Sequence, residues 1–226
     1  MFCQFCGTPM PENARFCTNC GRQQPGGEAA SRQYVIPANV RAQTGRWFTE
    51  GWNVVQSEWG MFALIALIFL VISGVVPVVL QGAMIVGIHI VCWRKLAGGP
   101  ADINDLFKGF NYFVPALAAF VVISVFATAG FLLCIIPGFV ILAMYTFTYL
   151  FIADKKMDFW AAMQASHAIV RQDYFGFTWF IVLAALINIA GALLFGAGLL
   201  VSIPLTYAAI TAAYRDIAGF EPGGVM

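Results

Sequence analysis

The stretch that decides the fold is Ile135–Asp154, with the sequence IIPGFVILAMYTFTYLFIAD. It carries a Pro-Gly pair near its start and no charged side chain before Asp154, and it is followed at once by Lys155 and Lys156. A helix of about 20 apolar residues is long enough to cross the hydrocarbon core of a bilayer. The stretch therefore predicts a membrane-spanning helix that ends at a charged surface.

The composition extends this prediction to most of the chain. Of its 226 residues, 61% are hydrophobic and only 10% are charged, whereas soluble domains are about 25% charged. A soluble fold needs polar side chains to cover its surface, and this chain has too few of them. The formal net charge of +1 provides no field that would attract nucleic acid. We expect an all-α, multi-pass membrane protein.

Three long blocks lack Asp, Glu, Lys and Arg, namely residues 59–93, 109–153 and 174–214. A single helix through any of them would be roughly 50–65 Å long, but the hydrocarbon core is only about 30 Å thick. Because backbone groups in lipid must be paired within helices, each block is expected to fold back as a helical hairpin. The candidate turn residues are Gly74, Pro77, Cys134, Pro137, Gly138, Gly191, Gly196 and Gly198. The six predicted spans cover about 60–76, 77–94, 111–133, 137–154, 175–195 and 198–215.

The positive charges predict the orientation of these hairpins. All 12 Lys and Arg residues lie in the N-terminal segment, in the loops 94–108 and 154–173, or at the C-terminal end. Six spans place all of these segments on one side, and positively charged loops stay in the cytoplasm. Both termini are therefore expected to be cytoplasmic, in the inner or plasma membrane. A single span through 59–93 is the alternative, and it would place the N-terminus outside.

Four cysteines near the N-terminus form two C-x-x-C pairs, Cys3 with Cys6 and Cys17 with Cys20. A glycine follows each pair, where the positive φ of a tight turn is easily adopted. Two such turns facing each other supply four thiolates in a tetrahedral arrangement, which suits structural Zn²⁺ and leaves no open position for a catalytic water. About twenty residues cannot build a core, so the metal is expected to supply the free energy of folding.

Two disulfides are the alternative for these cysteines. No signal peptide is expected, because Cys3 lies where its basic and apolar regions would be, and reducing compartments disfavour disulfides. Residues 3–22 resemble the zinc-ribbon family in its minimal form. The resemblance implies a small rigid surface that docks a protein, with nucleic acid second because only Arg15 and Arg22 are basic.

The expected domains are the zinc ribbon (1–22), a linker rich in Gly, Pro, Gln, Ala and Ser (23–45), the transmembrane domain (46–220) and a tail (221–226). The transmembrane domain is expected to begin with an interfacial helix, because aromatic rings beside charges suit the headgroup zone. The residues behind this prediction are Arg46, Trp47, Phe48, Glu50, Trp52, Val55, Glu58 and Trp59. Two short surface helices are expected in the charged loops, with Asp102 and Asp158 as N-caps.

The second half of the chain carries a further resemblance. The motifs are Asp105-Leu-Phe-Lys-Gly-Phe110, Ile136-Pro-Gly-Phe139, Phe159-Trp160, Ser166 and Ala212-Ala-Tyr-Arg-Asp216. Over residues 47–220 the chain resembles an uncharacterised prokaryotic family of six-helix membrane proteins, similar to the membrane domain of some glycerophosphodiester phosphodiesterases. The resemblance implies a fold and no activity, since the metal ligands of the phosphodiesterase barrel have no counterpart in this sequence.

Residues that could carry chemistry are few. The three blocks without Asp, Glu, Lys or Arg contain a single histidine, His89. It is either a packing residue that is hydrogen-bonded to a neighbouring helix or a proton relay. Scattered polar groups fit helix packing or a substrate path equally well: Gln81, Ser124, Thr128, Thr146, Thr148, Asn188, Ser202 and Thr206. No hydrolase, P-loop or metalloprotease motif is present, so we expect no enzyme, no catalytic residue and no bound organic cofactor.

Two functions follow from these features. In the first, the helices anchor a zinc ribbon that docks a protein partner at the membrane. In the second, the helices form a transporter or lipid-handling protein and the ribbon regulates it, because helices interrupted by Pro and Gly often line substrate sites. The sequence favours the first by a small margin and leaves the oligomeric state undetermined.

Overall fold

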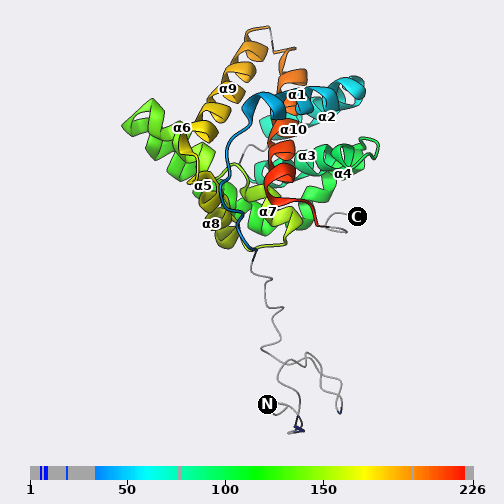
Figure 1. Ribbon diagram of the computed structural model, residues 1–226. Helices are drawn as coiled ribbons and strands as arrows, with labels where there is room; N and C mark the ends of the chain where they lie inside the picture. The colour runs from blue at the N-terminus through cyan, green and yellow to red at the C-terminus, as the bar shows by residue number, and fades with distance from the viewer. Residues whose placement is uncertain are drawn as a thin grey trace. The chain divides into compact units, whose positions relative to one another are not determined.

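The computed structural model describes residues 34–75, 78–194 and 196–221, together with Cys6, Thr8, Pro9 and Asn19. The chain divides into two compact units, residues 1–35 and 36–226, and each is described by itself. The second unit is helical and has no β-strand among its described residues (Figure 1). Its α-helices are α1 (Thr44–Ser57), α2 (Trp59–Val75), α3 (Gln81–Leu96), α4 (Ile103–Phe107), α5 (Phe113–Leu133), α6 (Ile135–Met144), α7 (Thr148–Asp154), α8 (Phe159–Val170), α9 (Tyr174–Leu193) and α10 (Leu199–Ala218), and a 3₁₀-helix, η1 (Lys108–Tyr112), links α4 to α5.

Three helical stretches are long and apolar enough to cross a membrane: Ile103–Leu133, Ile135–Asp154 and Tyr174–Leu193. A fourth is added if α1 and α2, which are bent by 99° at Glu58, count as one span. The prediction of six spans is not confirmed by this criterion. The helices α2 and α3 have 17 and 16 residues, slightly fewer than the roughly 20 that a straight span needs, and α10 contains Pro204, Arg215 and Asp216.

The helix ends agree with the predicted hairpin turns. The helix α5 stops before Cys134, which is fully extended, and α6 starts directly after it. Pro137 therefore lies in the first turn of α6, where its missing N–H costs no helical hydrogen bond. The helices α9 and α10 are separated by a turn that contains Gly196 at a φ of +76°, a value that favours glycine.

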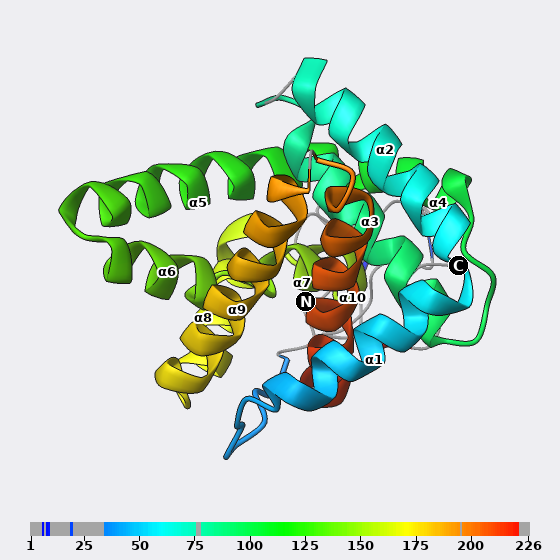
Figure 2. The same cartoon turned by 90° about the horizontal axis from the view of Figure 1, so that it is seen from above.

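The helix α10 lies at the centre of the second unit and packs against α1, α2, α3 and α9 (Figure 2). Its contact face is built from small residues, which let neighbouring backbones approach closely. The helix α1 shows this best, because a Cβ atom added to Gly51 would lie 2.8 Å from the backbone nitrogen of Ala209. The helix α3 is also buried along most of its length.

The tryptophans of α1 and of the first position of α2 divide into two groups. Trp52 and Trp59 are 46% and 70% exposed, which suits the predicted headgroup contact. Trp47 is only 1% exposed, and its indole Nε1 donates a hydrogen bond to Asp216 at 3.1 Å. The prediction of Trp47 as a headgroup residue is therefore wrong, because it anchors α1 to the end of α10.

The two short loop helices are present with the predicted N-caps. Asp102 accepts a hydrogen bond from the backbone N–H of Asn104, and Asp158 accepts one from Trp160. The helix α8 differs from the expected surface helix because one whole face is buried, including Ala162, Met163 and Ser166.

The residues just before α1 are hydrogen-bonded to the loop between α8 and α9. The side chain of Gln172 accepts a hydrogen bond from the N–H of Val40 (3.0 Å) and donates one to the carbonyl of Pro37 (2.8 Å). Asp173 accepts from the N–H of Ala42 at 3.0 Å. The anchored part of the chain therefore includes residues 37–42, which the sequence assigns to the linker.

Candidate functional site

The predicted zinc ligands lie mostly outside the described residues. Nothing is described for Cys3, Cys17 and Cys20, whereas Cys6 is exposed and lies next to Thr8. The Oγ1 of Thr8 is 3.3 Å from the Sγ of Cys6. A hydroxyl at this distance can donate to a thiolate, the form of sulfur that binds zinc.

One hydrogen bond connects the two predicted C-x-x-C turns. The amide Nδ2 of Asn19, which lies between Cys17 and Cys20 in the sequence, donates to the Oγ1 of Thr8 at 3.0 Å. Thr8 in turn lies beside Cys6. Asn19, Thr8 and Cys6 are thus neighbours in space, and the four predicted ligands, Cys3, Cys6, Cys17 and Cys20, have by their chemistry a donor set that fits a structural zinc ion.

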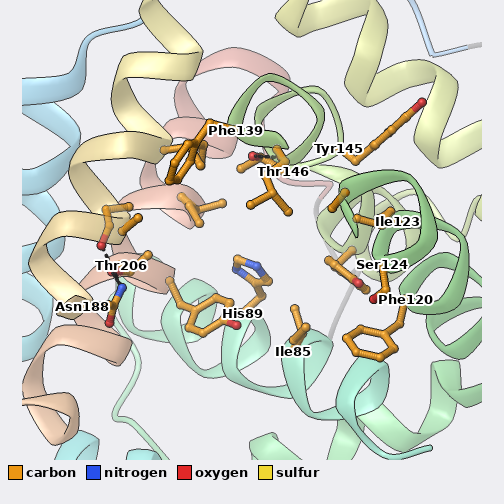
Figure 3. A pocket seen from close by; sticks show the side chains of 18 of the residues that line it. Ile85, His89, Phe120, Ile123, Ser124, Phe139, Tyr145, Thr146, Asn188 and Thr206 are labelled. Carbon is orange, nitrogen blue, oxygen red and sulfur yellow. Dashed lines mark hydrogen bonds between the residues drawn. The ribbon is translucent and has the colours of Figure 1, made fainter. Parts of the chain in front are cut away.

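A second candidate site is a cavity of about 510 Å³ within the helical unit. Side chains of α3, α5, α6, α7, α9 and α10 and of the turn between α6 and α7 line it. Figure 3 shows these side chains around an open space. Ile85 and His89 lie on one side of it, and Phe139 and Thr146 lie on the opposite side. Its lining contains no charged residue among those described.

Among the described residues that line the cavity, His89 is the one with an acidic or basic side chain. It is 1% exposed, and its Nδ1 is 2.8 Å from the Oγ1 of Thr211 on α10. Its ring also meets the ring of Tyr207 edge-on, with centroids 5.1 Å apart. The hydrogen bond to a neighbouring helix that the packing interpretation predicts is therefore present.

Five of the eight scattered polar residues line the cavity: Ser124, Thr128, Thr146, Asn188 and Thr206. Asn188 on α9 also holds the third hairpin together. Its Nδ2 donates to Thr206 at 2.8 Å, and its Oδ1 accepts from Ser202 at 3.0 Å. Because these two bonds join α9 to α10, they account for Asn188, Ser202 and Thr206 as packing residues.

The helix that spans 135–154 is interrupted where it lines the cavity. The turn at residues 145–147 separates α6 from α7, and the side chain of Ser166 from α8 bridges it. The Oγ of Ser166 donates to the carbonyl of Met144 (2.8 Å) and accepts from the N–H of Phe147 (3.1 Å). Ser166 thus satisfies two backbone groups that the interruption leaves without helical partners, as non-helical backbone at membrane depth requires.

We expect the change Ser166→Ala to destabilise the helical unit by about 1–3 kcal/mol, because it leaves two buried backbone groups unpaired. Thermal unfolding of the purified protein in detergent measures the effect. Ser57→Ala is the matched control, since Ser57 is an exposed residue whose hydroxyl bonds to a carbonyl of its own helix. Equal unfolding midpoints for the two variants would contradict this role of Ser166.

Sequence reasoning missed the cavity and the role of Ser166. His89 and the five scattered polar residues that line the cavity come from four helices and the turn at 145–147, so no sequence spacing relates them. The Pro-Gly pair did indicate an irregular helix, but the interruption falls seven residues after Gly138, at a position that has no Gly or Pro.

The comparisons with known proteins bear on the N-terminal segment alone. A model of the zinc-ribbon domain family matches residues 2–23, which supports the predicted ribbon and its zinc. No curated protein and no solved structure matches the chain significantly. The resemblance of residues 47–220 to a six-helix membrane family therefore stays a prediction, and the chain is shown to carry a zinc-ribbon domain followed by apolar helices.

Proposed function

We propose that this protein is a multi-pass membrane protein whose cytoplasmic zinc ribbon docks a protein partner at the membrane surface. The match of residues 2–23 to the zinc-ribbon family carries the proposal. Cys3, Cys6, Cys17 and Cys20 would hold a structural Zn²⁺, which supplies folding energy and no reaction. The helices would serve as the anchor, with lipid around them, and no enzymatic activity is proposed.

The ion pairs of the helical unit support a common side for its charged segments. They join residues that are far apart in the sequence but were all assigned to the cytoplasmic side: Arg46 with Asp216, Glu50 with Arg215, Glu58 with Lys95, and Lys155 with Glu221. The hydrogen bond from the Lys95 ammonium holds the pKa of Glu58 below its usual range. Segments that meet on one side require an even number of passes between them, a condition that the proposed six spans satisfy and three spans do not.

A second function, transport or handling of a lipid, is favoured by the cavity. Its mainly apolar lining and the interrupted helix beside it are features of membrane proteins that bind small molecules. In this case the ribbon would regulate the helices instead of being held in place by them.

Purification from native membranes tests the docking proposal. The full chain is compared with a variant that lacks residues 2–33, a boundary chosen because Pro37, Val40 and Ala42 are bound to the helical unit. Proteins that copurify are identified by mass spectrometry. We expect a partner protein with the full chain that is absent from the shortened one. The same proteins in both samples would contradict docking by the ribbon.

A further inference from the structure

We infer that the cavity binds a neutral lipid alcohol, whose hydroxyl donates a hydrogen bond to the Nε2 of His89. The inference concerns the helical unit alone. It specifies a ligand class for the second function and does not depend on what the ribbon docks.

The hydrogen bonds around His89 determine which ring nitrogen carries the hydrogen. Thr211 donates its single hydroxyl hydrogen to the carbonyl of Tyr207 at 2.7 Å. Its oxygen must therefore accept from His89, which places the imidazole hydrogen on Nδ1. The ring is neutral, because a buried charge needs an ionised partner and none lines the cavity.

The Nε2 atom of the neutral ring is then a hydrogen-bond acceptor. No side chain or backbone group of the described residues bonds to it, although His89 is 99% buried. Figure 3 shows the imidazole projecting from α3 into the open space of the cavity. This acceptor faces the cavity without a protein partner, so a ligand that donates an O–H to it would gain a hydrogen bond that the protein leaves unmade.

The rest of the lining defines the other end of the ligand. Apart from a few hydroxyl and amide groups, the walls are aromatic and aliphatic, with Phe120, Phe131, Phe139 and Ile181 among them. Without an Arg or Lys, the site cannot neutralise a phosphate or a carboxylate. A volume of about 510 Å³ falls within the range of about 300–1,000 Å³ that is usual for small-molecule sites. These features fit one hydrocarbon chain that carries an uncharged hydroxyl head.

Access to the cavity is from the apolar surface of the unit. Thr128 and Phe131 line the cavity and are also exposed. They lie beside the tip of the α5–α6 hairpin, where Leu132, Leu133 and Ile135 are 83%, 84% and 68% exposed. Thr128 and Phe131 both lie within the apolar stretch Ile103–Leu133, which is long enough to span a membrane, so this side of α5 would face lipid and a ligand would reach the cavity without passing through water.

Photolabelling with matched probes tests the inference on the full-length protein in lipid nanodiscs. One probe is a C16 alcohol with a diazirine in its chain, and the other is its methyl ether, which cannot donate. Labels are located by peptide mass spectrometry. Ile123 and Ala127 face the cavity, whereas Val121 and Val125 on the same helix are exposed and report background contact with lipid.

We expect the alcohol to label Ile123 and Ala127 about fivefold more than the ether does, the effect of one buried hydrogen bond. Val121 and Val125 should take up both probes equally. Equal labelling of the cavity by both probes, or no labelling there, would overturn the inference.

Two variants separate ligand binding from packing. His89→Asn keeps an N–H near the position of Nδ1 for Thr211 but has no atom near Nε2. His89→Gln places an amide oxygen near Nε2 and loses the bond to Thr211. We expect Asn to abolish the preference for the alcohol and Gln to retain part of it. The reverse order would show that His89 acts only through Thr211 and would overturn the inference. His167→Asn, at a half-buried position of α8 that does not line the cavity, is the control and should leave the preference unchanged.

Discussion

Changing Cys3 to Ser is expected to release the zinc and to unfold residues 2–23, while the helical unit keeps its stability. Structural zinc contributes roughly 10–16 kcal/mol to the folding of such small modules, far more than about twenty residues gain from packing. Because residues 1–35 form a unit of their own, the loss should stay within it. Zinc content by metal analysis and limited proteolysis of the N-terminal segment measure the effect.

Cys134→Ser is the matched control for this prediction. Cys134 is exposed at the α5–α6 turn and is not one of the four predicted ligands, so this variant should keep one zinc ion per chain. Full zinc content in the Cys3 variant, or loss of zinc in the Cys134 variant, would show that the ligand set is wrong.

The second large effect is expected at Gly87, in the middle of α3. A Cβ atom at this position would lie 1.9 Å from the carbonyl oxygen of Leu106 and 2.8 Å from its carbonyl carbon. Both are backbone atoms that no rotamer change can move away. Gly87→Ala should therefore force α3 away from α4 and cost at least about 3 kcal/mol, the upper part of the range for overpacked cores.

Thermal unfolding and size-exclusion chromatography in detergent measure this loss. Gly60→Ala is the control, because nothing lies within 4 Å of a Cβ atom added there and alanine favours the helix by up to about 1 kcal/mol. If Gly87→Ala unfolds at the same temperature as Gly60→Ala or at a higher one, the close contact between α3 and Leu106 is contradicted.

The sequence predicts the local features of the fold because each is determined by a few adjacent residues. The turn at Cys134 precedes a Pro-Gly pair, and the α9–α10 turn contains Gly196 in a conformation that glycine adopts readily. The N-caps at Asp102 and Asp158 depend only on a carboxylate and an N–H two residues later. The apolar blocks and the Gly and Pro residues that interrupt them therefore locate the helix ends to within a few positions.

Contacts between distant segments could not be predicted in this way. Trp47 looked like a headgroup residue because charges are its neighbours in the sequence, but its partner Asp216 is 169 positions away. Ser166 looked like one polar residue of a surface helix until the interrupted helix at 145–147 was seen beside it. The cavity depends on helices from all three hairpins, and a single sequence does not reveal which of their faces meet.

Cysteine labelling across the membrane tests the central claim, a multi-pass protein with its charged segments on the cytoplasmic side. Cys134 is a native reporter at an uncharged hairpin turn, and Lys156→Cys adds one in the charged loop after α7, where Lys156 is exposed. A membrane-impermeant maleimide is applied to intact spheroplasts and to permeabilised ones, and peptide mass spectrometry reads each site. We predict that Cys134 reacts in intact spheroplasts and that the cysteine at position 156 reacts only after permeabilisation. Reaction at position 156 in intact spheroplasts, or at Cys134 only after permeabilisation, would contradict the claim.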